Sequence, residues 1–191
     1  MNLTDGTLNA HTVTGNVIQS AGFVGIQNLN GSATLNGGTL EAISVSGTVT
    51  NNGGIVAPGS SPAISTFGSY IQDGSATLEM EIGGTTAGAA GYDQLIVTGD
   101  TELAGTLDVI LIDLGSGLFE PAEGDTFVLF DFQGTVTGWF DTVNLPDLAE
   151  GLLWLNDLST TGTLTVVPEP SAYSLLVSLF ALAYIANRRK M

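Results

Sequence analysis

Positive charge is almost missing from this chain. Its three basic residues, Arg188, Arg189 and Lys190, are adjacent at the C-terminus, while 19 residues are acidic and the formal net charge is −16. Residues 1–187 therefore carry no Lys or Arg that could neutralise a phosphate backbone, and counterion release cannot drive nucleic-acid binding. The composition excludes nucleic acid as a partner and favours divalent cations or cationic partners instead.

Cysteine is absent, and His11 is the only histidine. Without cysteine the chain has neither disulfides nor thiolate metal sites. With no lysine outside the C-terminal cluster, the other common nucleophiles and bases are missing too. We expect His11, in a polar N-terminal stretch, to be an exposed and inert side chain. The sequence also lacks a P-loop, a Rossmann glycine pattern and a zinc-binding histidine pair, and it predicts a protein that is not an enzyme.

Helical periodicity is missing before Pro168, and short β-type runs recur between Gly, Asn and Asp residues. Examples are residues 12–15, 43–47 and 95–99. A Gly-Thr pair followed by Leu or Val begins at Gly6, Gly38, Gly47, Gly105, Gly134 and Gly162. Short strands bounded by glycine are typical of rungs that bury a core only by stacking, although their irregular separations prove no single repeat length. The pattern predicts an all-β body that forms a right-handed parallel β-helix.

Two parts are expected within this body. Residues 1–58 are predicted to form β-helix rungs, and residues 57–62 form a turn-rich joint. Residues 59–166 are predicted to be the β-rich C-terminal part of the solenoid with a cap, because both tryptophans, Trp139 and Trp154, lie there. Strands are expected at 94–97, 106–111 and 126–132. The nearest helix candidate, residues 147–155, is short and contains a glycine.

The second part resembles the C-terminal end of autotransporter-type β-helix passengers and of surface proteins with autotransporter-associated repeats. The resemblance covers residues 57–166. It rests on Pro58-Gly59-Ser60-Ser61-Pro62, Tyr92-Asp93-Gln94-Leu95, Gly105-Thr106-Leu107, Gly124-Asp125-Thr126-Phe127 and Gly138-Trp139-Phe140. It implies a β-helix passenger with a better-packed terminal region.

An uncharged, mostly apolar run occupies residues 171–186, directly before Asn187 and the basic cluster. Its length is slightly under the roughly 17–25 residues that a membrane span needs, so a buried core helix is the alternative on length alone. Basic residues that flank a span stay cytoplasmic. The sequence predicts one transmembrane helix over residues 171–187, with Arg188, Arg189 and Lys190 inside and the acidic body outside.

The order of Val167-Pro168-Glu169-Pro170-Ser171, the apolar run and the terminal basic cluster closely resembles the PEP-CTERM sorting signal of Gram-negative bacteria. The resemblance implies that residues 167–191 are a sorting tail. It implies that Pro168, Glu169 and Pro170 are recognised by an exosortase, an integral-membrane enzyme thought to process such proteins at this tripeptide, and that the basic cluster is a cytoplasmic stop. It further implies transient attachment to the inner membrane with the body in the periplasm. The protein would then reach the cell surface or extracellular matrix, with exopolysaccharide or other surface proteins as partners.

The N-terminus differs from that of an exported protein. Residues 1–6 contain neither a basic n-region nor an apolar h-region, so they are no signal peptide. Since an exported body needs one, either the true start lies upstream of Met1 or this chain is a fragment of a longer gene. We favour the fragment, with further rungs and a signal peptide upstream.

Carboxylates are the remaining candidates for chemistry. Glu79 and Glu81 alternate with apolar residues and should share one strand face; a glycosidase needs only such a pair, although we favour a solvated outer face. Hard oxygen ligands for calcium are available at Asp93, Asp100, Asp108, Asp113, Asp125 and Asp131. No EF-hand loop or glycine-aspartate nonapeptide organises them, so we predict no catalytic residue, dedicated metal site or cofactor, and leave weak calcium binding open.

Three functions follow from these patterns. The first is a non-catalytic, exported protein of the cell surface or exopolysaccharide matrix, sorted by its tail. The second is a carbohydrate-active β-helix enzyme, and the third is an autotransporter-like adhesin passenger fragment.

Overall fold

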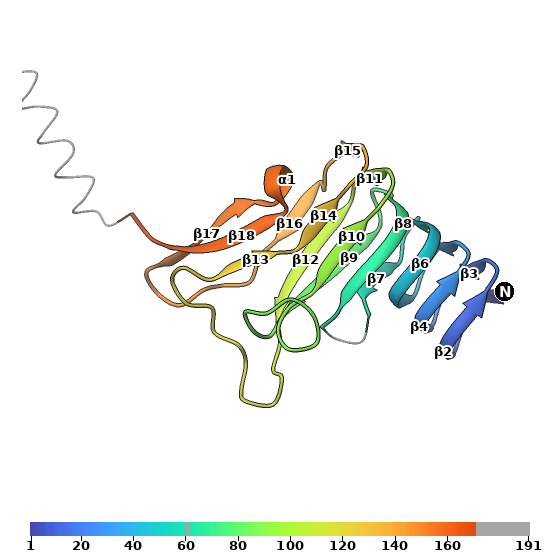
Figure 1. The fold of residues 1–191 in the computed structure, drawn as a ribbon, viewed down its shortest axis with the longest axis horizontal. Helices are drawn as coiled ribbons and strands as arrows, with labels where there is room; N and C mark the ends of the chain where they lie inside the picture. Colours follow the sequence, from blue (N-terminus) through green and yellow to red (C-terminus); the bar gives the residue numbers. More distant parts are fainter. Residues whose placement is uncertain (60–61, 171–191) are drawn as a thin grey trace, which may run out of the picture.

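Strands dominate the computed structural model, which describes residues 1–59 and 62–170 (Figure 1). The strands of the coil are β1 (Asn2–Leu3), β2 (Thr7–Thr14), β3 (Val17–Gln19), β4 (Phe23–Asn30), β5 (Ala33–Leu35), β6 (Thr39–Asn51), β7 (Ile55–Pro58), β8 (Ile64–Gln72), β9 (Thr77–Ile82), β10 (Gln94–Val97), β11 (Thr101–Leu103), β12 (Thr106–Leu111), β14 (Phe130–Phe132), β15 (Val136–Gly138) and β16 (Thr142–Asn144). The remaining elements are β13 (Thr126–Val128), β17 (Leu152–Asp157), α1 (Leu158–Thr161) and β18 (Thr163–Pro168).

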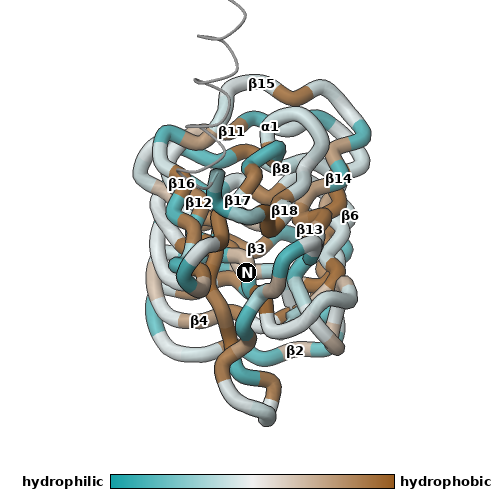
Figure 2. Tube along the Cα trace, turned by 90° about the vertical axis from the view of Figure 1, so that its left-hand side faces the viewer, coloured by the Kyte–Doolittle hydropathy of each residue, from teal (hydrophilic) through white to brown (hydrophobic). Residues whose placement is uncertain are grey.

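The coil consists of three stacks of parallel strands. The first side is formed, in order along the coil, by β2, β4, the start of β6, β7, β9, β12 and β16. The second side is formed, in order, by the ends of β2 and β4, the middle of β6, and then β8, β10 and β14. The third side is formed, in order, by β1, β3, β5, the end of β6, the end of β8, β11 and β15. The end-on view shows the successive turns of the coil lying behind one another (Figure 2). The predicted β-rich body with parallel strands is confirmed.

A rung in the N-terminal part is 16 residues long. Asn2 pairs with Ile18, Val17 with Ala33, and the backbone of Thr48 bonds Ser32, 16 positions earlier. Later rungs are longer, since Thr66 pairs with Ile96 and loops are inserted at 83–93 and 112–125. The 16-residue repeat holds as far as β7, where Thr39 pairs with Ile55, and lengthens to 22 residues in the next rung, where Ile55 pairs with Thr77. No single repeat length can be read from the sequence, because these changes displace the later rungs along the chain.

Glycine occupies one corner of the coil in six successive rungs, at Gly15, Gly31, Gly47, Gly68, Gly99 and Gly134. A Cβ added to Gly31 would lie 2.5 Å from the carbonyl oxygen of Gly15, and one added to Gly134 would lie 2.3 Å from that of Gly99. Real Cβ atoms do not approach a backbone oxygen this closely. The high glycine content therefore follows from the close stacking of backbone at this corner.

Buried amide side chains close another corner. Gln19 donates from Nε2 to the carbonyl oxygens of Gly22 and Thr39, both at 2.9 Å. Asn51 does the same with Gly54 and Thr77 at 3.1 Å. Each amide thus bonds its own turn and the next rung. The carbonyl oxygens of Gly22 and Gly54 also accept the backbone N–H groups of Thr39 and Thr77, so the amide adds a second hydrogen bond at each.

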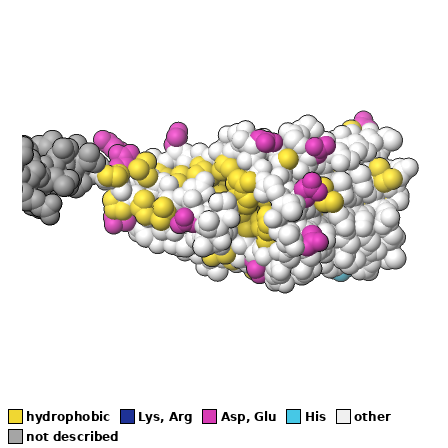
Figure 3. All heavy atoms as spheres, turned by 90° about the horizontal axis from the view of Figure 1, so that it is seen from above, with side chains coloured by type: hydrophobic (Ala, Val, Ile, Leu, Met, Phe, Trp, Pro, Cys, Tyr) yellow, Lys and Arg dark blue, Asp and Glu magenta, His cyan; other side chains and the backbone are white. Residues whose placement is uncertain are grey.

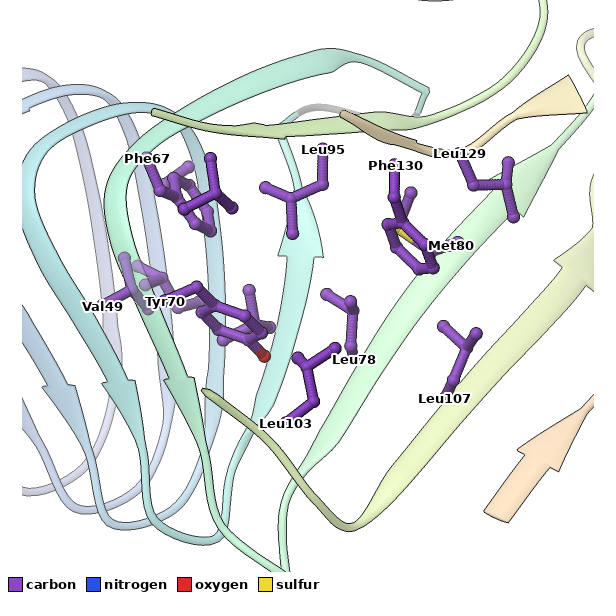
Figure 4. Packing of buried hydrophobic residues seen from close by; sticks show 14 of the residues in the cluster. Val49, Phe67, Tyr70, Leu78, Met80, Leu95, Leu103, Leu107, Leu129 and Phe130 are labelled. Atoms are coloured by element: carbon purple, nitrogen blue, oxygen red, sulfur yellow. The ribbon is translucent and has the colours of Figure 1, made fainter. Parts of the chain in front are cut away.

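The core lies between the three stacks and runs without a break across the joint near Pro58. Along β9 the side chains alternate, with Leu78, Met80 and Ile82 buried and the residues between them half-buried. Figure 4 shows Phe67, Leu78, Met80, Leu95 and Phe130 pointing into this space. Burying one such leucine contributes about 1.5–3 kcal/mol.

A three-stranded antiparallel sheet, ordered β13-β18-β17, caps the C-terminal end of the coil. Phe127 and Leu164 are fully buried beneath it. Phe127 makes edge contacts with Tyr92 at 5.4 Å and with Trp154 at 5.8 Å between ring centroids. The indole of Trp154 donates to the carbonyl oxygen of Pro146 at 2.8 Å. These aromatic contacts cover the last rungs of the core.

Most strand predictions agree with the structure. The predicted strands 94–97 and 106–111 coincide with β10 and β12, while 126–132 divides into β13 and β14. The stretch 147–155, the nearest helix candidate in the sequence, forms no helix, and its second half is strand β17; the four-residue α1 follows it. Within the described residues, no helix is long and apolar enough to cross a membrane. The predicted helix at 171–187 lies outside these residues.

Candidate functional site

The predicted sorting tripeptide begins where the cap ends. Pro168 is the last residue of β18 and pairs with Leu152, and the backbone N–H of Glu169 donates to the carbonyl oxygen of Gly151 at 2.8 Å. Pro168, Glu169 and Pro170 are all exposed. The tripeptide is thus accessible at the end of the body far from the N-terminus (Figure 1).

Pro168 and Pro170 keep the chain extended where it leaves the cap. A proline has no N–H with which to continue a ladder, and it disfavours helical conformation in the residue before it. Val167, which precedes Pro168, accordingly remains in strand β18. The predicted cytoplasmic stop, Arg188, Arg189 and Lys190, lies outside the described residues.

A second candidate site is the carboxylate face, defined here as Glu41, Glu79, Glu81 and Asp108 on the first side of the coil. Glu79 and Glu81 share the outer face of β9, as the alternation predicted. Asp108 pairs with Glu79 in the neighbouring rung. Neither Glu41 nor the proximity of Asp108 to the pair could be predicted from the sequence, because only the strand register brings these residues together.

The carboxylates of this face repel one another. Partial burial raises the pKa of Glu79, and the charges of Glu81 and Asp108 add to the effect. Burial also raises the pKa of Glu41, with further contributions from Glu81 and Glu79. Glu81 Oε2 is buried and has no hydrogen-bond partner among the described residues. A carboxyl with a raised pKa beside other carboxylates is the kind of arrangement that general acid catalysis uses.

Asp93 lies next to this face and is buried, with 1% of its surface exposed. Its Oδ1 accepts the N–H of Ala63 at 2.6 Å, and its Oδ2 accepts the N–H of Glu81 at 2.8 Å. Burial raises the pKa of Asp93 to about 7, against the lowering effect of these two hydrogen bonds; the charges of Glu81 and Glu79 raise it further. Asp93 therefore fastens the inserted loop 83–93 to β9 and to the residue directly before β8, and the Tyr92-Asp93 motif has a structural role.

The other aspartates considered for calcium are also held in separate local arrangements. Asp113 Oδ1 accepts the backbone N–H groups of Gly115, Ser116 and Gly117, which lowers its pKa. Asp100 bonds the N–H of Thr135, Asp108 bonds Asn144, Asp125 bonds Ala122 and Asp131 bonds Gln133. In residues 1–59 and 62–170, no group of three or more His, Asp or Glu side chains is arranged to hold a metal ion.

His11 is exposed on β2, as expected from the sequence. It lines a shallow hollow on the first side together with Asn9, Gln27 and Glu41. Its imidazole makes no hydrogen bond within the part of the chain that the structure describes. The geometry supplies no oriented base next to a serine or threonine hydroxyl at this position.

Comparisons of the chain with protein-family models, with curated proteins and with solved structures give no match.

Proposed function

We propose that this chain is a non-catalytic, exported protein of the cell surface or extracellular matrix, which an exosortase sorts through the tail at residues 167–191. The observation that carries the proposal is the exposed Pro168-Glu169-Pro170 segment where the chain leaves the cap. In the sequence this segment is followed directly by the uncharged run 171–186 and the three basic residues. These parts stand in the order that insertion with a cytoplasmic C-terminus requires.

The shape and the charge of the body support a passive role outside the cell. It is elongated, with a capped end from which the tail departs (Figure 1), and its strongly acidic surface favours solubility. We take the coil to be right-handed, since crossovers between parallel strands of one sheet almost always are. The proposed route is transient attachment to the inner membrane with the body in the periplasm, then transfer to the surface, with exopolysaccharide or other surface proteins as partners.

The test is a size and location assay in a Gram-negative host that has an exosortase, with a signal peptide supplied. The wild-type chain is expected to yield a shortened form that is released or bound to the surface. Replacement of Pro168, Glu169 and Pro170 by alanine is expected to give a full-length membrane form, because none of these residues lies in the apolar run. Identical processing of both chains would overturn the proposal.

A carbohydrate-active enzyme is the second candidate, and the raised pKa values of Glu79 and Glu41 on the carboxylate face favour it. Glu79 would donate a proton to the leaving oxygen, and Glu81 would be the second carboxylate of the pair. Hydrolysis of a panel of polysaccharides, measured for the wild type and for Glu79→Gln and Glu81→Gln, tests this candidate. Activity that both substitutions abolish would establish the enzyme and displace the first proposal.

A further inference from the structure

A continuous groove runs over the third side of the coil. Two hollows adjoin there and share Ile71, Glu102 and Thr137 as lining residues. Ile71 pairs with Glu102 in the strand register, and Glu102 pairs with Thr137. The three side chains therefore form one column across β8, β11 and β15, along the axis of the coil.

A second polar column lies beside the first. Thr48 pairs with Ser69, and Asp100 accepts the backbone N–H of Thr135 at 3.0 Å. All four residues line the same groove. Neighbouring parallel strands are about 4.8 Å apart, so the two columns present polar groups at a regular interval along the groove.

The groups in the groove suit a ligand rich in hydroxyl groups. The hydroxyls of Thr48, Ser69 and Thr135 can donate and accept, and the carboxylates of Asp100 and Glu102 accept. Within the described residues, the Glu102 carboxylate has no hydrogen-bond partner. Ile71, which is 36% exposed, adds an apolar contact. Sugar rings combine hydroxyl groups with apolar C–H faces, and this groove offers partners for both.

Charge restricts the class of sugar polymer. Every Lys and Arg of the chain lies at 188–190, so no basic side chain of the described body can pair with a uronate, sulfate or phosphate group. Figure 3, which views the molecule from the side of β11 and β15 in Figure 1, shows scattered carboxylates, a hydrophobic band near the middle of this surface and no basic residue in the described part. A polyanion would meet Asp100, Glu102 and the overall negative potential without compensation.

We propose that this groove binds an uncharged glycan chain laid along the axis of the coil. The inference rests on the proposed matrix association and names the class of polymer that the body contacts. Glu102 and Asp100 accept hydrogen bonds from sugar hydroxyls, the threonine and serine hydroxyls make the reciprocal bonds, and Ile71 packs against a ring face.

Affinity electrophoresis of the full chain in a polyoxyethylene detergent tests the proposal, since this detergent carries no sugar headgroup. Hydroxyethyl cellulose, dextran and galactomannan serve as uncharged polymers, and alginate serves as the polyanion. We expect at least one uncharged polymer to slow the chain and alginate to leave its mobility unchanged. Glu102→Ala combined with Thr137→Ala should weaken the apparent affinity about tenfold, as expected for two lost hydrogen bonds.

The matched control is Glu123→Ala combined with Thr142→Ala, which removes the same groups at exposed positions outside the groove. It should bind as the wild type does. Circular dichroism of each variant verifies that it is folded, and Glu102→Gln, which keeps the size of the side chain, should also weaken binding. No retardation by any uncharged polymer, equal retardation by alginate, or equal binding by the groove and control variants would overturn the inference. Tail processing is measured separately, so binding can fail while sorting holds.

Discussion

The carboxylate of Asp93 and the backbone N–H of Ala63, 30 residues apart in the chain, form a buried hydrogen bond of 2.6 Å. The other carboxylate oxygen binds the N–H of Glu81, so one side chain joins the end of β9 to the start of β8 across the loop 83–93. Asp93→Ala would leave both N–H groups without an acceptor, at about 1–3 kcal/mol each, and would also remove a buried charge. We expect a net loss of about 2 kcal/mol in the free energy of unfolding, measured by urea denaturation. Asp131→Ala, at an exposed position, should change it by less than about 0.5 kcal/mol.

Stability should rise as the pH falls from 8 to 5. The folded-state pKa of Asp93 is about 7, above its ordinary value of 3.8, so the folded protein takes up a proton before the unfolded chain does. The stabilisation that comes from protonating Asp93 is complete below pH 3.8 and is lost as the pH rises through 7. It amounts to at most about 4 kcal/mol. The raised pKa values of Glu79 and Glu41 act in the same direction, and the lowered pKa of Asp113 matters only in more acidic solution.

Urea titrations at pH 8, 6.5 and 5 measure this dependence, and Asp93→Asn should flatten it. A free energy of unfolding that stays constant or falls between pH 8 and pH 5 would contradict the placement of Asp93 as a buried group crowded by carboxylates.

Gly38 is required by the stacking of the rungs. Its φ is +81°, and an added Cβ would lie 2.4 Å from the carbonyl oxygen of Gly22 in the preceding rung. Gly38→Ala should therefore lower the free energy of unfolding by roughly 2–3 kcal/mol, from backbone strain together with displacement of the rung. Gly6 is the matched control, because its φ is +89° but nothing lies within 4 Å of an added Cβ. Gly6→Ala should cost about 1 kcal/mol, and equal losses in thermal unfolding would refute a stacking constraint.

Local patterns in the sequence predicted the strands and their faces well. The alternation around Glu79 and Glu81 depends only on adjacent residues, so their shared face could be predicted without knowledge of the fold. Glu41 could not be added to that face, because its proximity depends on how the rungs are stacked across the joint near Pro58. Rung length was hidden for the same reason, since each inserted loop shifts the later strands by a different number of residues.

The groove and the role of Asp93 were beyond sequence reasoning altogether. Ile71, Glu102 and Thr137 are far apart in the chain, and only the register of β8, β11 and β15 aligns them. Asp93 was grouped with other aspartates as an oxygen ligand, whereas its function depends on the N–H of Ala63 after the joint. The proposed sorting tripeptide is different, because a short linear motif is fully contained in the sequence.

The basic cluster should determine the orientation of the tail. Arg188, Arg189 and Lys190 are the only positive side chains that can hold the C-terminus in the cytoplasm. Replacing all three with asparagine should reduce the fraction of chains with a cytoplasmic C-terminus, measured by protease protection of a C-terminal epitope in spheroplasts. An unchanged fraction would show that these charges do not orient the tail.

The mass of the exported protein tests the central claim most directly. The intact form is isolated from the surface or medium of an exosortase-bearing host, and its C-terminal residue is identified by mass spectrometry. Sorting through the tail predicts a C-terminus within or beside residues 168–170, without the basic cluster. An exported form that still ends in Arg188-Arg189-Lys190-Met191 would contradict the account.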